Sequence, residues 1–250
     1  MIKKIALAVF SVILLSGAGM ASAHGDASKG VAAAIAAPDR PEADVKRDAA
    51  RQPAKVLIFS AIKPGDMVAD LGAGGGYFTR LISGIVGEHG QVIAQNPPDW
   101  VEQYKSIAPA LAALAKARPN VKAVTAKFDD LGFTDESLDV VTMALIYHDV
   151  VLSSADTGAM NKQIYAALKP GGVYLITDHH AKAGSGDAST EKLHRIDAAL
   201  VRKAVEAAGF TLEAQSDALH FDSDDRTKNV FDPSVRGKTD RFVYRFRKAK

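Results

Sequence analysis

The 250-residue sequence contains no cysteine, and this absence excludes several kinds of chemistry at once. Without thiols the chain forms no disulfide, uses no cysteine nucleophile and binds no zinc through sulfur. An excess of charge of one sign is also missing, because 31 Lys and Arg residues stand against 29 Asp and Glu residues. A chain this close to neutral lacks the basic surface of nucleic-acid-binding proteins, so we expect no DNA or RNA partner.

The N-terminus has the order of a cleavable signal peptide. Two lysines precede an apolar run over residues 5–15, and small residues follow it and end in Ala-Ser-Ala at residue 23. The apolar run is shorter than the roughly 20 residues of a membrane-spanning helix, and no cysteine follows it for lipid attachment. We therefore predict a signal peptide over residues 1–23, a mature N-terminus at His24, a periplasmic location and no stable membrane anchor after cleavage. Cleavage would bring the formal net charge from +2 to zero.

The rest of the chain is predicted to form a short leader and one domain. Residues 24–42 are rich in Ala, Asp, Gly and Pro and show no sustained period, which predicts a flexible leader. Residues 43–250 are of a size that normally folds around a single core. After a turn at residues 63–66, short apolar runs alternate with longer amphipathic ones. This alternation is typical of βαβ units and predicts an α/β fold with a mostly parallel sheet.

The periodicity gives the expected elements. Strands are expected at residues 67–71, 91–95, 121–125, 138–144, 172–177, 210–214 and 242–246. Helices are expected at residues 76–86, 99–117, 157–168 and 190–208. The polar connection over residues 217–239 is unusually long for a compact domain, so we expect either a functional loop or partial disorder.

A glycine-rich motif directly follows the first expected strand. Residues 70–76 read Asp-Leu-Gly-Ala-Gly-Gly-Gly and lead into an expected helix. Glycines let the backbone approach a ligand closely, and the following helix N-terminus offers unpaired amides, so such a loop can hold a nucleotide-like molecule. The dinucleotide fingerprint requires a third glycine where Tyr77 stands, which disfavours NAD. The alternative interpretation is a structural turn without a ligand.

The same stretch resembles motif I of class I S-adenosylmethionine (SAM) dependent methyltransferases, an acidic residue followed by Gly-x-Gly-x-Gly. The matching residues are Asp70, Gly72, Gly74 and Gly76. By that resemblance Asp70 engages the methionine end of SAM and the glycines border the cofactor. The resemblance covers residues 43–248 and includes segments 138–141 and 168–172. It implies a Rossmann-like, doubly wound and mostly parallel seven-stranded sheet with an antiparallel last strand.

Three further positions follow from this resemblance. Asp129 and Asp130 come after the third expected strand, where the family often places a residue that contacts the adenine. At the end of the second strand the family usually carries an acid that binds the ribose, and this chain has Asn96. Asn96 can hydrogen-bond a hydroxyl, but without the strength of a carboxylate. Segments 95–98, 147–149 and 194–197 also resemble a group of predicted bacterial methyltransferases that carry signal peptides.

Histidines follow the late strands and begin the last expected helix. They are His148, His179, His180 and His194. The carboxyl ends of strands in an open α/β sheet line the ligand crevice, so these side chains are expected to converge there. Methyl transfer leaves the protein to align the acceptor and to remove its proton, which suits a neutral imidazole.

These considerations assign candidate catalytic residues. We predict His148 as the general base, with Tyr147 and Asp149 shaping the acceptor site and Asp178 or His179 as alternatives. His194 and Asp197 are expected to share one helix face as a further acid–base pair or as a weak surface pair.

The sequence therefore predicts an exported SAM-dependent methyltransferase acting on a small molecule or an envelope component, and it names no acceptor. One alternative is a domain that binds SAM or a nucleoside without catalysis. Another is a metal-dependent enzyme built on the His and Asp residues, but no His-x-x-x-His or His-Glu-x-x-His spacing supports a metal, and we predict none. Basic residues could clamp an anionic acceptor, although solvated charge is the simpler explanation. They are Arg47, Arg51, Arg236, Lys238 and Arg241.

Overall fold

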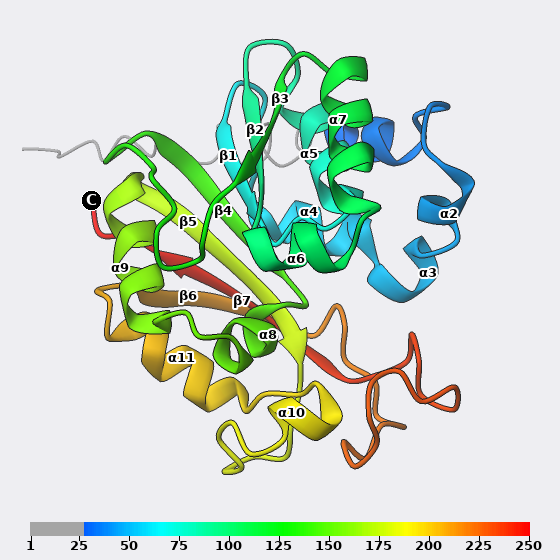
Figure 1. Cartoon of the computed structure of the whole chain (residues 1–250), viewed down its shortest axis with the longest axis vertical. Coiled ribbons are helices and arrows are strands. Elements are labelled where there is room, and N and C mark those ends of the chain that lie inside the picture. The colour runs from blue at the N-terminus through cyan, green and yellow to red at the C-terminus, as the bar shows by residue number, and fades with distance from the viewer. Residues whose placement is uncertain (1–27) are drawn as a thin grey trace, which may run out of the picture.

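The computed structural model describes residues 28–250 and shows one mixed sheet covered by helices on both faces (Figure 1). The predicted signal peptide lies outside the described residues. The strands are β1 (Met67–Leu71), β2 (Gln91–Asn96), β3 (Val121–Thr125), β4 (Leu138–Ala144), β5 (Leu168–His179), β6 (Thr211–Ser216) and β7 (Arg241–Arg247). Their order is β3-β2-β1-β4-β5-β7-β6, and β7 runs antiparallel to both of its neighbours. The predicted fold class is confirmed.

The central strands read as apolar runs because both of their faces are covered. Val68 and Ala69 in β1 and Val141 in β4 are fully buried although they lie on different faces of the sheet. A parallel sheet between two helical layers selects this pattern rather than an alternation of apolar and polar residues. All five strands predicted before residue 180 are present.

The helices divide between two core clusters, one on each face of the sheet. The helices are α2 (Glu42–Val45), α3 (Asp48–Arg51), α4 (Pro53–Ser60), α5 (Tyr77–Val86), α6 (Pro98–Gln103), α7 (Ile107–Ala117), α8 (Tyr147–Leu152), α9 (Thr157–Ala167), α10 (Thr190–Leu193) and α11 (Ala198–Glu206). Helices α4, α5 and α7 pack in one cluster, and α8, α9 and α11 pack in the other. Among residues 28–250, no helix has the length and apolar character needed to cross a bilayer.

The predicted flexible leader is wrong for its described part. Residues 28–35 form a helix, and Val31 and Ala34 are buried in the cluster that contains α5. Arg40 then donates two hydrogen bonds to the carboxylate of Asp48, at 2.7 and 2.6 Å. Alanine has a high helix propensity, so the alanine-rich composition of this segment favours a helix. Val31 and Ala34 lie one turn apart on the same face, and their burial docks this helix on the domain.

The predicted helix over residues 190–208 is two helices. His194 ends α10 with a left-handed backbone conformation (φ 52°), and Asp197 begins α11 by accepting a hydrogen bond from the amide of Ala199 at 2.9 Å. Asp197 also accepts from the amide of Gly184 at 2.7 Å, a contact from outside the helix. His194 and Asp197 therefore do not share a helix face, and the predicted pair is wrong. The expected helix over residues 99–117 is likewise divided, into α6 and α7.

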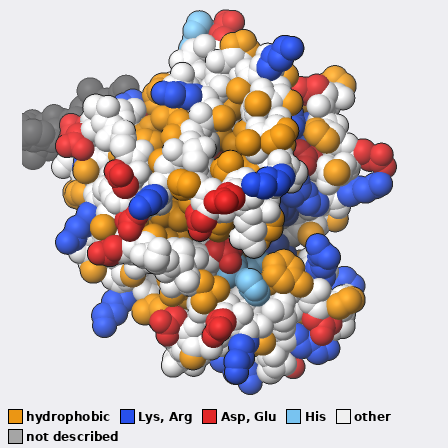
Figure 2. All heavy atoms as spheres, in the orientation of Figure 1, with side chains coloured by type: hydrophobic (Ala, Val, Ile, Leu, Met, Phe, Trp, Pro, Cys, Tyr) orange, Lys and Arg blue, Asp and Glu red, His pale blue; other side chains and the backbone are white. Residues whose placement is uncertain are grey.

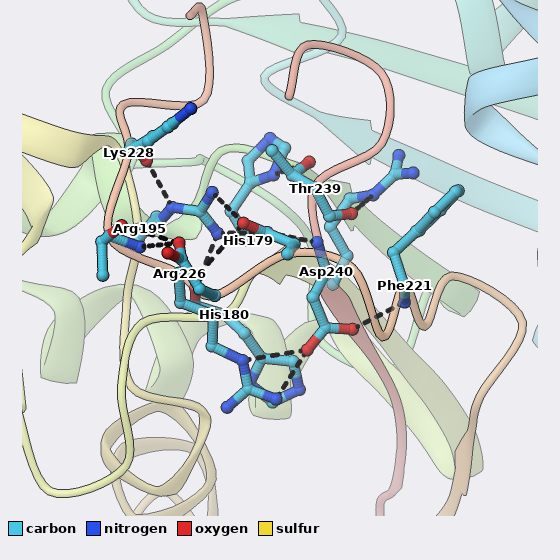
Figure 3. Close-up of polar contacts among 12 residues, drawn as sticks. His179, His180, Arg195, Phe221, Arg226, Lys228, Thr239 and Asp240 are labelled. Atoms are coloured by element: carbon cyan, nitrogen blue, oxygen red, sulfur yellow. Dashed lines mark hydrogen bonds and ion pairs between the residues drawn. The ribbon is translucent and has the colours of Figure 1, made fainter. Parts of the chain in front are cut away.

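The long connection before β7 is an ordered loop held by two ion pairs, of which one is fully buried (Figure 3). The side chain of Arg195 is fully buried, donates to Asp224 at 2.8 and 3.0 Å, and donates to the carbonyls of Lys228 and His180. Asp240, just before β7, accepts from Arg226 at 2.6 Å. The loop is thereby fastened beside the carboxyl end of β5.

Candidate active site

The first cavity opens at the carboxyl ends of β1 and β4, where the strand order reverses. Ligands of open α/β sheets bind at this switch point. The cavity has a volume of about 300 Å³, within the range of small-molecule sites. Its lining combines Asp70 and the glycine loop with the end of β4 and the residues after it, and with the segment that contains α6 and the start of α7; these residues are Ala144, Leu145, Ile146, Trp100, Tyr104 and Ile107.

The glycine loop adopts a conformation that other residues tolerate poorly. Gly72 and Gly74 have φ angles of 61° and 55°, in the left-handed region. A Cβ atom on Gly72 would lie 2.3 Å from the Cδ1 atom of Ile146. The helix that follows, α5, begins after Gly76, which offers no capping side chain, and the backbone amide of Thr79 in its first turn instead hydrogen-bonds the carboxylate of Asp70. The predicted glycines thus border the cavity through Gly72 and Gly74, with Gly76 at the start of α5.

Asp70 supplies a buried carboxylate at this cavity. It is 2% exposed and accepts hydrogen bonds from the hydroxyls of Thr79 at 2.6 Å and Thr142 at 3.0 Å. Burial raises the pKa of Asp70, outweighing the lowering effect of these hydrogen bonds. Asp70 forms no ion pair with any side chain of residues 28–250. The charge of Arg51, which lines the same cavity, acts on Asp70 only from beyond ion-pair distance, and a desolvated carboxylate that forms no ion pair fits the ammonium group at the methionine end of SAM.

Asn96 lies behind the glycine loop and not in the lining of the cavity. Its side-chain oxygen accepts from the amide of Gly74 at 2.8 Å, and its side-chain nitrogen donates to the carbonyl of Gly74 at 3.1 Å. Gln95 similarly accepts from the amide of Gly72 at 3.1 Å. Asn96 is 1% exposed, and both polar atoms of its side chain bond Gly74, so Asn96 holds the loop in place. Its contact with a ribose hydroxyl stays a prediction.

Asp129 and Asp130 also lie outside the first cavity. Asp129 accepts from the amide of Asp156 at 3.1 Å and lines a separate hollow of about 340 Å³, whereas Asp130 is exposed. This hollow includes Phe128, whose ring meets Trp100 of the first cavity edge to face at 5.6 Å. The predicted adenine contact therefore stays a prediction for Asp129, while the structure brings Asp130 to neither space.

A histidine and two carboxylates meet where β4 leads into α8 and β5 ends. His148 is 3% exposed, and its Nδ1 atom lies 2.8 Å from Asp178, which also accepts from the backbone amide of His148 at 2.8 Å. The Nε2 atom of His148 lies 3.3 Å from Asp149, and Nδ1 of His194 lies 3.6 Å from the same carboxylate oxygen. Predicted residues from three segments are thus brought together: His148 and Asp149 from α8, Asp178 from β5, and His194 at the end of α10.

Burial and neighbouring charge move the two central imidazoles in opposite directions. Burial favours the neutral ring of His148, but the charges of Asp178 and Asp149 and the hydrogen bond to Asp178 outweigh it and raise the pKa of His148. Burial lowers the pKa of His179 to about 3, so this ring is neutral at any ordinary pH. The Nδ1 atom of His179 lies 2.8 Å from the hydroxyl of Thr239 (Figure 3). The site therefore holds one readily protonated imidazole beside one that stays neutral.

A second cavity of about 360 Å³ adjoins the first. His148 and His179 line it, and Leu145, Asp149, Arg47 and Arg51 line both cavities. Figure 2 shows histidine and acidic side chains at the bottom of a hollow in this face, with basic side chains beside it. A ligand under the glycine loop and a second ligand next to His148 would lie against each other.

Tyr147 and His180 do not join this site. Tyr147 is 1% exposed and packs in the core beneath α8, where its hydroxyl accepts from Asn161 at 2.9 Å. The predicted role of Tyr147 in shaping the acceptor site is therefore wrong, because one residue along a helix turns the side chain to a different face. The ring of His180 packs against Phe242, since neighbouring strand residues point to opposite faces.

The histidine cluster also has the spacing of a metal site. One ligand atom from each of His148, Asp149 and His194 lies within 4.8 Å of the others. Imidazole and carboxylate suit zinc and other divalent transition metals, and Asp178 would orient His148 as such ligands require. A proton shared between His148 and Asp149 satisfies the same geometry. The predicted absence of a metal stays a prediction.

Sequence reasoning missed part of the lining. Trp100 and Tyr104 reach the first cavity from the helix pair after β2, and Pro97 and Pro98 marked the start of that pair. Asp178 was expected only as an alternative base, whereas it is the hydrogen-bond partner of His148.

Comparison with known proteins gives a consistent result. Residues 68–172 match the methyltransferase domain family. The ubiquinone/menaquinone biosynthesis C-methyltransferase UbiE of Vibrio vulnificus is 30% identical over 119 residues, which cover 48% of this chain. The match spans 43% of that relative, so the chain aligns with less than half the length of this curated protein.

Solved structures share the fold over most of the chain. A SAM-dependent methyltransferase from Aquifex aeolicus superimposes with a TM-score of 0.61 at 20% identity, covering 86% of this chain and 97% of its own. An arsenic(III) S-adenosylmethionine methyltransferase from Chlamydomonas reinhardtii superimposes with a TM-score of 0.56 at 18% identity, covering 88% and 73%. At these identities the likeness concerns the fold.

Proposed function

We propose that this chain, a class I SAM-dependent methyltransferase domain by its fold and by the match over residues 68–172, methylates a small molecule in its second cavity. The observation that carries the proposal is the contact between the two cavities. Leu145 and Asp149 line both, so the cofactor site and the histidine site open onto each other. A second cavity of about 360 Å³ suits a small acceptor.

The residues of the first cavity fit the cofactor. Asp70 would hold its ammonium group, and the backbone at Gly72 and Gly74 would border it. Bound SAM supplies a methyl group made electrophilic by its sulfonium. The protein's own task is to align an acceptor beside this cavity and to accept a proton from it.

His148 would accept that proton. The hydrogen bond to Asp178 fixes the proton of the neutral ring on Nδ1 and leaves a lone pair on Nε2 at the second cavity. After proton transfer, the carboxylate of Asp178 stabilises the imidazolium, as in other His–carboxylate pairs. Asp149, next to Nε2, can share the proton. His179 is the weaker base because burial holds its pKa near 3.

Calorimetry with S-adenosylhomocysteine (SAH), followed by assays of methyl transfer from labelled SAM to an acceptor panel, tests this function. We expect one SAH site per chain and transfer to at least one acceptor. Failure to bind either SAM or SAH would reject the proposal. Binding without transfer to any acceptor would favour the alternative of a SAM-binding domain without catalysis.

We further propose that the protein is exported to the periplasm through residues 1–23. The support is the sequence itself: two lysines, an apolar run and a terminal Ala-Ser-Ala. Expression of the full chain in a Gram-negative host should give a periplasmic product, and N-terminal sequencing should begin at His24. A product that stays with the cytoplasmic fraction and begins at Met1 would overturn this proposal.

A further inference from the structure

The second cavity is surrounded by more positive than negative charge. Four arginines line it, namely Arg47, Arg51, Arg236 and Arg241, against the single carboxylate of Asp149. Asp149 already contacts two imidazoles, His148 and His194. Arg47 is engaged by Asp44, with a nitrogen–oxygen distance of 2.5 Å. Arg51 and Arg241 form no ion pair with a carboxylate of residues 28–250, although carboxylates beyond ion-pair distance act on both, and the exposed Arg236 lies at the edge of the cavity.

Arg241 is a buried guanidinium with a free donor. The residue is 3% exposed, and its Nε atom donates to the carbonyl of Thr239 at 3.0 Å. Its Nη2 atom is buried and finds no hydrogen-bond partner in the described part of the chain. Buried polar groups are nearly always paired, so the unpaired donor of a residue that lines the second cavity points to a missing ligand. Arg241 pairs with His179 across β5 and β7, which places this donor beside the histidine site.

Arg51, the last residue of α3, lines the same cavity. Its guanidinium lies 4.6 Å from the ring centre of Tyr77, and no carboxylate of residues 28–250 forms an ion pair with it. Burial and the charge of Arg47 lower the pKa of Arg51. Burial and the charge of Arg51 in turn lower the pKa of Arg241 to about 10. Two cations that line one cavity, repel each other and form no ion pair with a carboxylate of residues 28–250 would be stabilised by an anion bound between them.

We propose that the second cavity binds an organic anion, with its carboxylate or phosphate group held by Arg241 and Arg51, and that this anion is the methyl acceptor. The second clause rests on the proposed function, whereas the anion site does not. Guanidinium groups hold either anion through paired hydrogen bonds. Leu145, Val230 and Phe231 give the rest of the wall an apolar character, so the acceptor carries an apolar body next to its charge.

The test uses benzoate, phenyl phosphate and uncharged benzyl alcohol as probes, titrated into the mature chain saturated with SAH. We expect at least one of the two anions to bind and benzyl alcohol to bind at least tenfold more weakly. The tighter anion distinguishes a carboxylate from a phosphate site. R241M should weaken the anion about 10- to 100-fold, because it removes one charge partner and keeps the side-chain length. K238M removes a charge from an exposed residue in the same segment and should change nothing.

The outcomes separate this proposal from the proposed function. Equal anion affinity in R241M and the parent chain, or no anion binding by the parent, would overturn the anion site. R241K retains the charge and serves if R241M does not fold; it should bind the anion more weakly than the parent because it loses the second donor. SAH affinity should stay within twofold in R241M; a loss of SAH affinity instead would assign Arg241 to the cofactor. If the chain binds the anion but does not bind SAH, the proposed anion site is supported and the proposed methyltransferase function is rejected.

Discussion

Replacement of His148 by alanine is expected to lower turnover about 100-fold or more while leaving SAH affinity unchanged. A general base contributes roughly that factor, and His148 lines the second cavity but not the first. Turnover with the identified acceptor and calorimetry with SAH measure the two effects separately. H180A is the matched control, because it removes a neighbouring imidazole that packs on Phe242 instead. Equal turnover in H148A and the parent chain would remove His148 from the mechanism.

The pH profile distinguishes a base from a structural histidine. The active form of His148 is the neutral ring, and Asp178 and Asp149 raise the pKa of this ring above 6.5. We therefore expect kcat/KM to rise with pH as His148 loses its proton, with the midpoint of the rise above pH 6.5. D178N removes the carboxylate charge that is hydrogen-bonded to His148, so the rise in kcat/KM should move to lower pH.

Dialysis against EDTA tests the alternative that the histidine cluster binds a metal. Activity lost on dialysis and restored by a divalent cation would assign His148, Asp149 and His194 to a metal instead.

The sheet was predictable because its signals are local. A strand buried on both faces needs a short apolar run, and the glycine loop needs residues with positive φ between β1 and α5; both can be recognised in a window of ten residues. Asp70 was placed at the cavity by its position in the glycine motif, and His148 and His179 by their positions after the fourth and at the end of the fifth strand. Chain position at a strand end was enough for the two histidines, and a local motif was enough for Asp70.

What was missed depends on contacts between distant segments. The break at His194 follows from the hydrogen bond between Asp197 and the amide of Gly184, which no helical period reveals. Asn96 matched the ribose position in sequence, yet its amide group is used by Gly74. The anion site joins Arg51 before the sheet with Arg241 in its last strand, and solvated charge was the simpler explanation until burial was known. The core of the fold could thus be predicted from neighbouring residues, whereas the acceptor site depends on contacts between segments that are distant in the sequence.

Replacement of Asp70 by asparagine is expected to weaken SAM binding about 100-fold. The buried carboxylate has no ion pair among the described residues, so its charge is available to the ammonium group of the cofactor, and loss of one partner of a buried charge pair costs about 2–5 kcal/mol. Asparagine keeps the shape of the side chain and can still accept from Thr79. Calorimetry with SAM and with SAH measures the loss, since both ligands carry the ammonium group.

The same substitution should not destabilise the fold, and this contrast identifies Asp70 as a ligand-binding residue. Burial raises the pKa of Asp70, so its ionised form costs folding free energy at neutral pH, and the neutral amide removes that cost. We expect the thermal midpoint of D70N without ligand to stay the same or to rise. D66N, at the other end of β1, should leave SAM affinity unchanged, because Asp66 bonds the amide of Lys63 and lies outside the first cavity. Undiminished SAM affinity in D70N would remove the carboxylate from the cofactor site, and a lower midpoint would show that it serves the fold instead.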